Sequence, residues 1–377
     1  MVRLLPGHRP AGHLVLPVAV GFVLGSLLSF MTLTHHYSTS PNSPSRSHSR
    51  PDAGQGASIP PIVHFVQLKK DESSGLHFSF ESFLALYSAY VFIRPVVIYI
   101  HTDHTPDDIT HAAQHGSSWT RKVLTAFPRV VRLNKVTART KANALEIKRV
   151  EHKSDFVRLD QLTLHGGIYL DWDVLTLRSA DPLLESGFKA VVGRQSDATV
   201  MNGILLAAKD SAVMRVMRRE TPRRFTGEWV EHSVNLITEV AQALAAVPRE
   251  VLIMDPGAFA PFTWTQESVN MALERHEGDA AAPRGLDPLA DRATLTEADP
   301  MAVWERHQVS QKKWWAHDFS DAFFLHNYFN DVESPKGYNG VSVPYVLARD
   351  SNYALAAWPI VAQGIRDGYI DEHDTSV

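Results

Sequence analysis

SDFVRLDQLTLHGGIYLDWDV, residues 154–174, joins a helical stretch, a double-glycine turn and a short apolar strand. Ile168–Leu170 is apolar and β-prone, which predicts a buried strand whose first polar side chains follow its carboxyl end. Gly166 and Gly167 can adopt backbone angles that other residues disfavour, so helix and strand can pack closely. Open α/β sheets bind ligands at the carboxyl ends of their strands, so this segment predicts a ligand site.

Two carboxylates follow the predicted strand. Asp171 and Asp173 are separated by one residue, and side chains two positions apart in extended backbone project from the same side. Hard oxygen ligands of this kind suit Mg²⁺ or Mn²⁺, and the oxygens of a diphosphate can fill the remaining positions of the ion. An isolated Asp-x-Asp is usually a solvated turn, so the metal-site interpretation depends on the surrounding motif.

The whole segment resembles the DXD-containing sugar transferases of glycosyltransferase family 32, such as fungal α-1,6-mannosyltransferases and inositolphosphoceramide mannosyltransferases. Their pattern is a Ser-Asp-x-x-Arg helix followed by Gly-Gly-x-Tyr-x-Asp-x-Asp. This sequence matches every position, with Ser154, Asp155, Arg158, Gly166, Gly167, Tyr169, Asp171 and Asp173. The resemblance implies a metal-dependent, retaining glycosyltransferase that uses Mn²⁺ or Mg²⁺ and a nucleoside diphosphate sugar.

Other parts of the resemblance are looser. Residues 59–67, IPPIVHFVQ, are similar to the family's first strand, but Gln67 stands where related enzymes have a Trp that is expected to stack on the nucleobase. MNGILLA, residues 201–207, resembles the segment that brings an Asn, here Asn202, towards the donor sugar. FFLH, residues 323–326, resembles the closing strand that ends in a His, but Asn327 follows where the family has Ser-Trp.

The resemblance implies a role for each matched residue. The implied metal ligands are Asp171, Asp173 and His326; the implied nucleotide contacts are Asp155, Arg158, Tyr169 and Asp171; and the implied catalytic residues are Asp171, Asp173 and Asn202. Simpler interpretations stay open, because Asp155 and Arg158 could pair along one helix face and Tyr169 could be a core aromatic. Asp103 emerges at the end of another predicted strand and is a further donor-site candidate. No carboxylate identifies itself as a nucleophile, which favours front-face attack by the acceptor.

Strand and helix patterns alternate after residue 59, which predicts an α/β fold with a mostly parallel sheet and helices on both faces. Together with the resemblance this gives a nucleotide-diphospho-sugar transferase domain of the GT-A type. The expected strands are Ile62–Val66, Val96–Ile100, Ile168–Leu170, Ala190–Val192, Gly203–Ala207, Val251–Met254 and Ala322–Leu325. The expected helices are Phe80–Tyr90, Ala144–Glu151, Asp155–His165 and Trp229–Leu244, and residues 278–300 are expected to form a loop at the site.

Composition narrows the function classes. The chain has 377 residues, a net charge of −4 and no cysteine. The absence of a basic excess argues against nucleic acid as a main partner. The absence of cysteine excludes disulfides, zinc-thiolate sites and a cysteine nucleophile. The histidines are scattered, and we expect His111, His115 and His152 on the surface because no ligand spacing accompanies them.

The amino-terminal region predicts a membrane anchor. Leu14–Leu33 is apolar and uncharged over roughly the 20 residues needed to cross a bilayer. Arg3 and Arg9 precede it and favour a cytosolic amino terminus, hence a single-pass type II protein of the Golgi or another secretory membrane with a luminal catalytic domain. The expected organisation is a tail (1–13), an anchor (14–34), a flexible stem (35–58) and a catalytic domain (59–377). A cleaved signal peptide is the alternative to an anchor.

Two other function classes stay open. Haloacid-dehalogenase-like phosphohydrolases also place Asp-x-Asp after a strand, but they expect Asp-x-Asp-x-Thr, and here Leu175 occupies the Thr position. A non-catalytic sugar-binding protein is disfavoured because both carboxylates and Arg158 are present. For a transferase, the donor could be GDP-mannose, UDP-galactose or UDP-N-acetylglucosamine, and the acceptor a glycan or a glycolipid.

Overall fold

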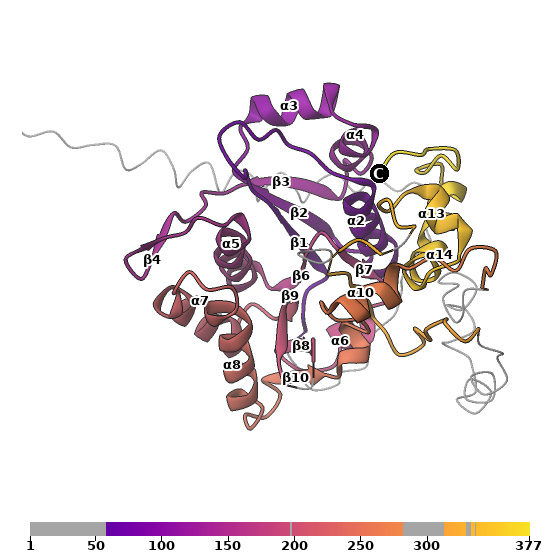
Figure 1. Ribbon diagram of the computed structural model, residues 1–377. Helices are drawn as coiled ribbons and strands as arrows, with labels where there is room; N and C mark the ends of the chain where they lie inside the picture. Colours follow the sequence, from indigo (N-terminus) through magenta and orange to yellow (C-terminus); the bar gives the residue numbers. More distant parts are fainter. Residues whose placement is uncertain (1–57, 197, 282–312, 329–332, 336) are drawn as a thin grey trace, which may run out of the picture. The chain divides into compact units, whose positions relative to one another are not determined.

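A seven-stranded sheet lies at the centre of the fold, in the order β10-β8-β9-β6-β1-β2-β3 (Figure 1). Its strands are β1 Ile62–Gln67, β2 Val97–Thr102, β3 Val131–Lys135, β6 Gly167–Leu170, β8 Ala190–Arg194, β9 Val200–Ala207 and β10 Val251–Met254. β9 pairs antiparallel with β6 and β8, whereas the other neighbours pair in parallel. The predicted α/β class with a mostly parallel sheet is therefore confirmed.

The computed structural model describes residues 58–196, 198–281, 313–328, 333–335 and 337–377, which belong to one unit, Gln55–Val377. The predicted tail, the anchor and nearly all of the stem lie outside these residues, as does most of the predicted loop 278–300. In the described ranges, no helix combines the length and the apolar character that a bilayer crossing requires.

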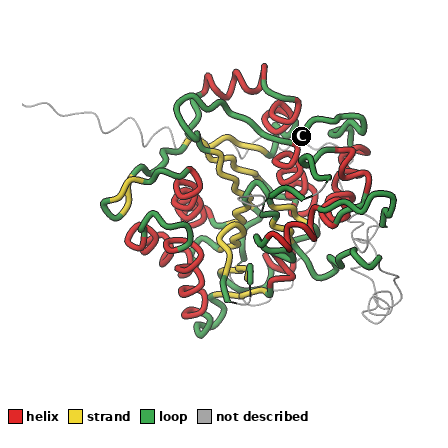
Figure 2. The backbone as a smooth tube through the Cα atoms, viewed as in Figure 1, coloured by secondary structure: helices red, strands yellow, loops and turns green. Residues whose placement is uncertain are grey.

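Helices cover both faces of the sheet (Figure 2). They are α2 Phe80–Ile93, α3 Pro106–His115, α4 Ser118–Thr125, α5 Val150–His165, α6 Asp181–Leu184, α7 Ala212–Arg224, a π-helical turn η2 Glu231–Asn235, α8 Leu236–Leu244, α9 Pro256–Phe259, α10 Gln266–Leu273, α13 Val343–Ala348 and α14 Asn352–Arg366. Alternation along β6 divides the core. Ile168 and Leu170 belong to the core cluster that includes residues of α2, α4 and α14, whereas Tyr169 belongs to the cluster that includes residues of α5, α7 and α8.

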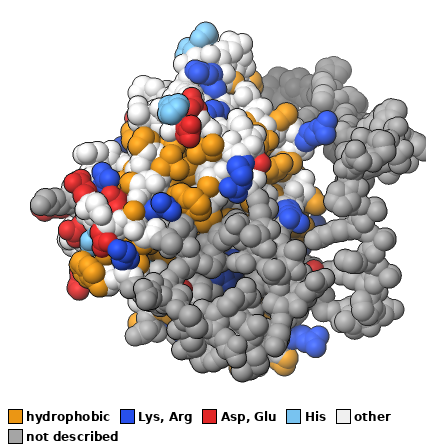
Figure 3. Space-filling view, turned by 90° about the vertical axis from the view of Figure 1, so that its right-hand side faces the viewer, with side chains coloured by type: hydrophobic (Ala, Val, Ile, Leu, Met, Phe, Trp, Pro, Cys, Tyr) orange, Lys and Arg blue, Asp and Glu red, His pale blue; other side chains and the backbone are white. Residues whose placement is uncertain are grey.

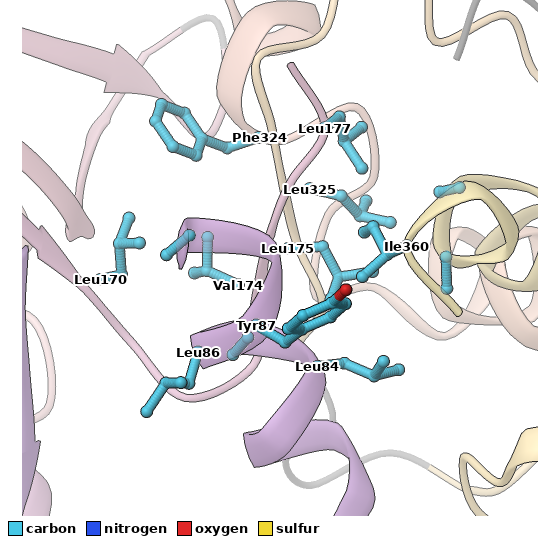
Figure 4. Close-up of a cluster of buried hydrophobic side chains, with 14 of the residues drawn as sticks. Leu84, Leu86, Tyr87, Leu170, Val174, Leu175, Leu177, Phe324, Leu325 and Ile360 are labelled. Atoms are coloured by element: carbon cyan, nitrogen blue, oxygen red, sulfur yellow. The ribbon is translucent and has the colours of Figure 1, made fainter. Parts of the chain in front are cut away.

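A separate two-stranded sheet begins directly after β6 in the chain. β7 (Val174–Thr176) pairs antiparallel with β11 (Phe324–His326), and the register sets His326 opposite Val174. Val174 and Leu175 are buried against α2, and Leu325 lies beside them near Ile360 of α14 (Figure 4). This packing fixes the end of β11 next to the segment that contains Asp173.

One predicted helix is wrong. Residues 144–151 do not form a single helix: β4 (Lys141–Ala142) and β5 (Leu145–Glu146) make a hairpin, and α5 starts only at Val150. Asn143 and Ala144 have φ angles of 47° and 62°, so a tight turn interrupts the helical pattern. The predicted helix 229–244 exists from Glu231, with its first turn in π form.

The described surface mixes charges of both signs with exposed apolar side chains. On the face in Figure 3, apolar side chains form a group that separate Lys and Arg side chains surround. The most exposed large apolar side chains include Val96 and Trp314. Isolated exposed apolar residues are normal. Three of the exposed large apolar residues in the described ranges, Trp229, Val230 and Trp264, line a cleft.

A chain of buried hydrogen bonds holds the glycine turn before β6. His64 Nε2 donates to the carbonyl oxygen of Gly166 (2.8 Å), so a neutral His64 accepts at Nδ1 from His101 Nε2 (2.9 Å). Asn134 Nδ2 in turn donates to His101 Nδ1 (2.8 Å). Gly167 has a φ of 110°, and a Cβ there would lie 2.4 Å from the Ile62 carbonyl oxygen, so the turn requires glycine.

Stability should fall as the pH falls from 7 to 5. Burial lowers the pKa of His64 to about 4 and that of His101 to about 2, whereas histidine in the unfolded chain titrates near 6.5. Below pH 6.5 these two histidines therefore bind protons in the unfolded state but stay neutral in the folded state. We expect the free energy of unfolding to fall by roughly 2 kcal/mol for each of these two histidines over this range.

Urea unfolding at both pH values measures this loss. His64→Gln should lose about 2 kcal/mol less than the wild type between pH 7 and pH 5. The exposed His111 provides a control, and His111→Gln should keep the wild-type pH dependence. An unchanged pH dependence in His64→Gln would show that this imidazole is not held neutral.

Candidate active site

A cleft of about 880 Å³ opens at the carboxyl ends of β1 and β6. The order of the strands reverses between β6 and β1: β2 and β3 lie beyond β1, whereas β9, β8 and β10 lie beyond β6. Open α/β sheets bind ligands at such a reversal. The described lining residues come from three walls and a floor. The first wall includes Val66, Gln67, Leu68, Lys70, Glu81 and Ser82. The second wall includes Val150, Glu151, His152, Ser154, Asp155, Arg158, Trp229, Val230, Ser233 and Val234. The third wall includes Gln195, Trp264 and Tyr328, and the floor includes Tyr169, Asp171, Trp172, Asp173, Asn202 and His326.

Asp171, Asp173 and His326 meet on the cleft floor, and this group of predicted metal ligands is named the metal cluster. Each offers one ligand atom, and these atoms lie within 4.8 Å of one another. His326 Nε2 is 3.3 Å from Asp173 Oδ1 and 4.0 Å from Asp171 Oδ2. Two carboxylates and one imidazole can hold Mn²⁺ or Mg²⁺ and leave other positions for a ligand's oxygens.

The surroundings of this cluster fit a divalent cation. Burial raises the pKa of Asp171 although Arg158 opposes it, and the neighbouring charge of Asp173 raises it further. Burial acts to lower the pKa of His326, but the carboxylates of Asp173 and Asp171 outweigh it and raise the pKa. A cation between the groups would relieve the repulsion between the two carboxylates and would be stabilised by both.

Gly203 keeps the space beside the cluster open. It lies on β9, its carbonyl oxygen accepts from Asp171 N (2.9 Å), and a Cβ there would lie 2.7 Å from both Asp171 Oδ2 and His326 Cε1. Any larger residue would therefore displace two of the three predicted ligands.

Replacement of Gly203 by alanine should weaken metal binding. Because the methyl group would displace first-sphere ligands, we expect the affinity for Mn²⁺ to fall about 10- to 100-fold. Electron paramagnetic resonance of free Mn²⁺ during a titration gives the affinity directly. Gly257→Ala is the matched control, since no atom lies within 4 Å of a Cβ at Gly257. Equal affinities in the two variants would mean that Gly203 does not border the ion.

Arg158 links the metal cluster to α5 through its contact with Asp171. Its Nη2 is 3.2 Å from Asp171 Oδ1 and 3.3 Å from Asp155 Oδ1, and its Nη1 donates to the Asn202 carbonyl oxygen (2.6 Å). Burial acts to lower the pKa of Arg158, but Asp171 and its other neighbours outweigh it and raise the pKa. The Asp155–Arg158 pair expected along the helix is present, and Arg158 also fixes the predicted metal ligand.

Asp155 is engaged at both carboxylate oxygens. Asn202 Nδ2 donates to Asp155 Oδ1 (2.9 Å), and His232 Nε2 lies 3.0 Å from Asp155 Oδ2. Tyr169 is buried, as a core aromatic would be, and its hydroxyl donates to Asp171 Oδ1. The structure thus brings Asp155, Asn202 and Tyr169 together with the metal cluster, in positions that orient Asp171 and Arg158.

Two side-chain predictions differ from the structure. Asp103 is not among the described residues that line the cleft; it accepts from the Lys69 backbone N–H (2.8 Å). His152, expected on the surface, is buried against the ring of His232, 4.7 Å between ring centroids. The reason is that α5 starts at Val150 rather than Asp155, which brings His152 into the packed first turn.

Sequence reasoning missed several cleft residues. Glu81, in the first turn of α2, lines the cleft. Burial, and to a lesser extent the negative charge of Asp173, raises the pKa of Glu81 well above its ordinary range. Trp264 and Tyr328 also line the cleft, from loops. His232 of η2 lies behind this lining, 3.0 Å from Asp155 Oδ2. The loop residues have no periodic pattern in the sequence. A π-helical turn is itself a frequent mark of functional sites, but its position could not be read from the sequence.

Comparisons with known proteins agree with the sequence resemblance. Residues 89–189 match the family described as "glycosyltransferase sugar-binding region containing DXD motif". Over 241 residues the chain is 25% identical to "Glucan organizing enzyme 1" of Cryptococcus neoformans var. grubii, covering 60% of this chain and 61% of that protein. The chain therefore spans about three fifths of that relative. These matches confirm the predicted resemblance to DXD-containing sugar transferases.

Similarity to solved structures is weaker. The glycosyltransferase GlyE of Streptococcus pneumoniae TIGR4 shares 11% identity at a TM-score of 0.40, with 84% of this chain and 66% of that chain covered. The galactosyltransferase LgtC, in complex with donor and acceptor sugar analogues, shares 15% identity at a TM-score of 0.30, with 53% and 76% covered.

Proposed function

We propose that the protein is a metal-dependent, retaining glycosyltransferase that moves a hexose from a nucleoside diphosphate sugar to a glycan or glycolipid. The observation that carries this proposal is the convergence of Asp171, Asp173 and His326 on the floor of a large cleft, beside the buried Asp155–Arg158 pair. Carboxylates at the carboxyl end of a strand, arranged for a cation, suit the diphosphate of such a donor.

The walls of the cleft suggest how the donor lies. The end of β1 supplies Val66, Gln67, Leu68 and the amine-bearing Lys70, which suit the nucleoside half of the donor at the point where the strand order reverses. The second wall supplies Ser154 and the floor supplies Asn202. Their hydroxyl and amide groups can form hydrogen bonds with sugar hydroxyl groups. The diphosphate would then lie between them, over the metal cluster.

Asp171, Asp173 and His326 would hold the ion, and the ion when bound neutralises the charge that builds up on the departing diphosphate. Arg158 and Tyr169 keep Asp171 in place by an ion pair and a hydrogen bond. Asp155 has both oxygens occupied, and the raised pKa of Glu81 favours its protonated form, so neither is a ready nucleophile. This supports front-face attack, in which the leaving phosphate oxygen accepts the proton of the acceptor hydroxyl.

The same proposal places the catalytic domain in the lumen of the Golgi or another secretory compartment, held by the anchor expected at residues 14–34. The uncharged stretch and the preceding Arg3 and Arg9 support it. A protease-protection assay on sealed microsomes tests the orientation: digestion of the carboxyl-terminal region without detergent would contradict it.

The phosphohydrolase alternative receives less support. Thr176, the nearest threonine after the Asp-x-Asp, is buried in β7, and its backbone N–H bonds to Ser88 Oγ (3.0 Å). It is not among the described residues that line the cleft. The threonine that such an enzyme needs beside its phosphate is therefore turned into the core.

A donor screen with the full-length protein tests the proposed function. GDP-mannose, UDP-galactose and UDP-N-acetylglucosamine are each incubated with Mn²⁺, and release of nucleoside diphosphate is measured with and without chelator. We expect release from at least one donor, and none after metal removal. Hydrolysis of phosphate monoesters without release from any nucleotide sugar would contradict the proposal.

A further inference from the structure

The third wall of the cleft carries an aromatic series that leads outward from the metal cluster. The ring of Tyr328 lies 4.1 Å from the ring of His326, and the ring of Trp264 lies 5.9 Å from Tyr328 in an edge-on arrangement, both measured between centroids. All three residues line the cleft. The series therefore connects the predicted metal ligand with the cleft surface by two ring-to-ring contacts.

Trp264 is presented by a well-anchored loop. Thr263 N donates to Ser268 Oγ (2.7 Å), and Thr265 is the N-cap of α10, where its Oγ1 accepts from Ser268 N (3.4 Å). Phe262, two residues earlier, is buried in the core. Between these fixed neighbours the Trp264 side chain keeps 46% of its surface exposed. Trp264 thus presents a large, half-exposed ring at the cleft, which suits a ligand with an apolar face.

A second tryptophan at the cleft differs from Trp264. Trp229 is 48% exposed, but the guanidinium of Arg149 lies 5.3 Å from its ring and the His152 imidazole 5.6 Å from it. Its ring thus already has cationic and aromatic partners from α5 and from the residue that precedes α5. Trp264 is the more suitable of the two for a ligand with an apolar face.

Trp264 lies on a different part of the cleft from the residues that suit the nucleotide. In the proposed donor position, the nucleoside half lies at the end of β1, where the strand order reverses. Trp264 follows β10 and α9 in the chain, and β10 is the edge strand opposite β3. Gln195, which accepts from the Tyr328 hydroxyl (3.5 Å), follows β8. Strands β9 and β8 lie between β6 and β10 in the sheet. A second ligand can therefore reach the metal cluster from this side without displacing the nucleotide.

We infer that Trp264, with Tyr328 beside it, is the acceptor platform, and that the acceptor presents a pyranose ring to it. A pyranose has an apolar face of C–H groups that can lie on an indole ring, while its hydroxyl groups stay available for Gln195 and for reaction. This inference rests on the proposed glycosyltransferase function and adds the chemical class of the acceptor end: a cyclic sugar, recognised by stacking.

Steady-state kinetics of Trp264→Ala tests the inference in the full-length protein. Methyl hexopyranosides serve as acceptor probes, and sorbitol, a linear polyol without a ring face, is the comparison. We expect the acceptor KM for the pyranosides to rise about tenfold, as the loss of one aromatic contact implies, with donor KM and acceptor-free release of nucleoside diphosphate unchanged. Trp264→Phe should restore most of the affinity, and Trp264→Leu, apolar but without a ring face, should not.

Trp314→Ala is the matched control, because Trp314 is 85% exposed and is not among the described cleft residues. It should keep wild-type kinetics. An unchanged acceptor KM in Trp264→Ala, with normal acceptor-free release, would overturn the platform alone. A raised donor KM would instead make Trp264 a nucleobase contact, which also overturns it. Failure of the wild type to release nucleoside diphosphate from any donor would overturn both this inference and the proposed function.

Discussion

Replacement of Asp173 by asparagine is expected to reduce sugar transfer roughly 1000-fold or more while the protein stays folded. Asp173 Oδ1 lies 3.3 Å from His326 Nε2, so the substitution removes one anionic ligand from the middle of the cluster. Asparagine has nearly the same shape, and the Asp173 backbone oxygen would still accept from Asn327 N (3.0 Å). Initial rates with saturating donor and Mn²⁺ measure the effect.

Asp160→Asn is the control for this substitution. Asp160 lies on α5 and pairs with Arg218 at the surface, at a distance of 2.5 Å. Its loss should leave transfer within about twofold of the wild type, since exposed ion pairs contribute little. A folded Asp173→Asn enzyme with wild-type activity would show that this carboxylate has a structural role alone.

Replacement of Arg158 by alanine should be the most destabilising single change at the site. Arg158 is buried and contacts the carboxylates of Asp155 and Asp171, so its loss leaves two negative charges without their partner. Breaking a buried pair in this way costs about 3–5 kcal/mol. Urea unfolding measures it, and Arg158→Lys should recover only part of the loss because an ammonium lacks the planar fork.

Arg218→Ala gives the matched comparison, since Arg218 forms a surface pair with Asp160 and should lose at most about 1 kcal/mol. Addition of Mn²⁺ should stabilise Arg158→Ala more than the wild type, because a cation relieves the charge that Arg158 otherwise balances. Equal stability of Arg158→Ala and wild type would contradict the internal role that its contacts indicate.

The sequence predicted the centre of the fold well because two strong local signals agree there. The apolar run 168–170 and the glycine pair before it together predict a helix, a turn and a strand. The structure has α5, the turn at Gly166 and β6 at these positions. The hairpin at residues 141–146 was missed because its turn uses Asn143 and Ala144, and Ala at positive φ has no signal in sequence. Propensity alone favoured a helix there.

Contacts that depend on distant segments were predicted only through the family resemblance or not at all. His326 joins Asp171 and Asp173 because β11 pairs with β7 in a register that no local pattern encodes. The Asp155–His232 contact joins residues 77 positions apart, and Trp264 reaches the cleft from a loop after β10. In each case the sequence shows what the side chain can bind, but long-range strand pairing and packing decide which residues lie next to it.

We propose that Asp171, Asp173 and His326 hold a divalent cation that in turn binds a nucleoside diphosphate. Calorimetric titration of the full-length protein with GDP and with UDP, in Mn²⁺ or in chelator, measures this binding. We predict binding of at least one nucleotide in Mn²⁺, a loss of affinity of at least tenfold in chelator, and the same loss in the Asp171→Asn, Asp173→Asn double variant even with Mn²⁺. Equal nucleotide affinity with and without Mn²⁺, or full affinity in the double variant, would contradict it.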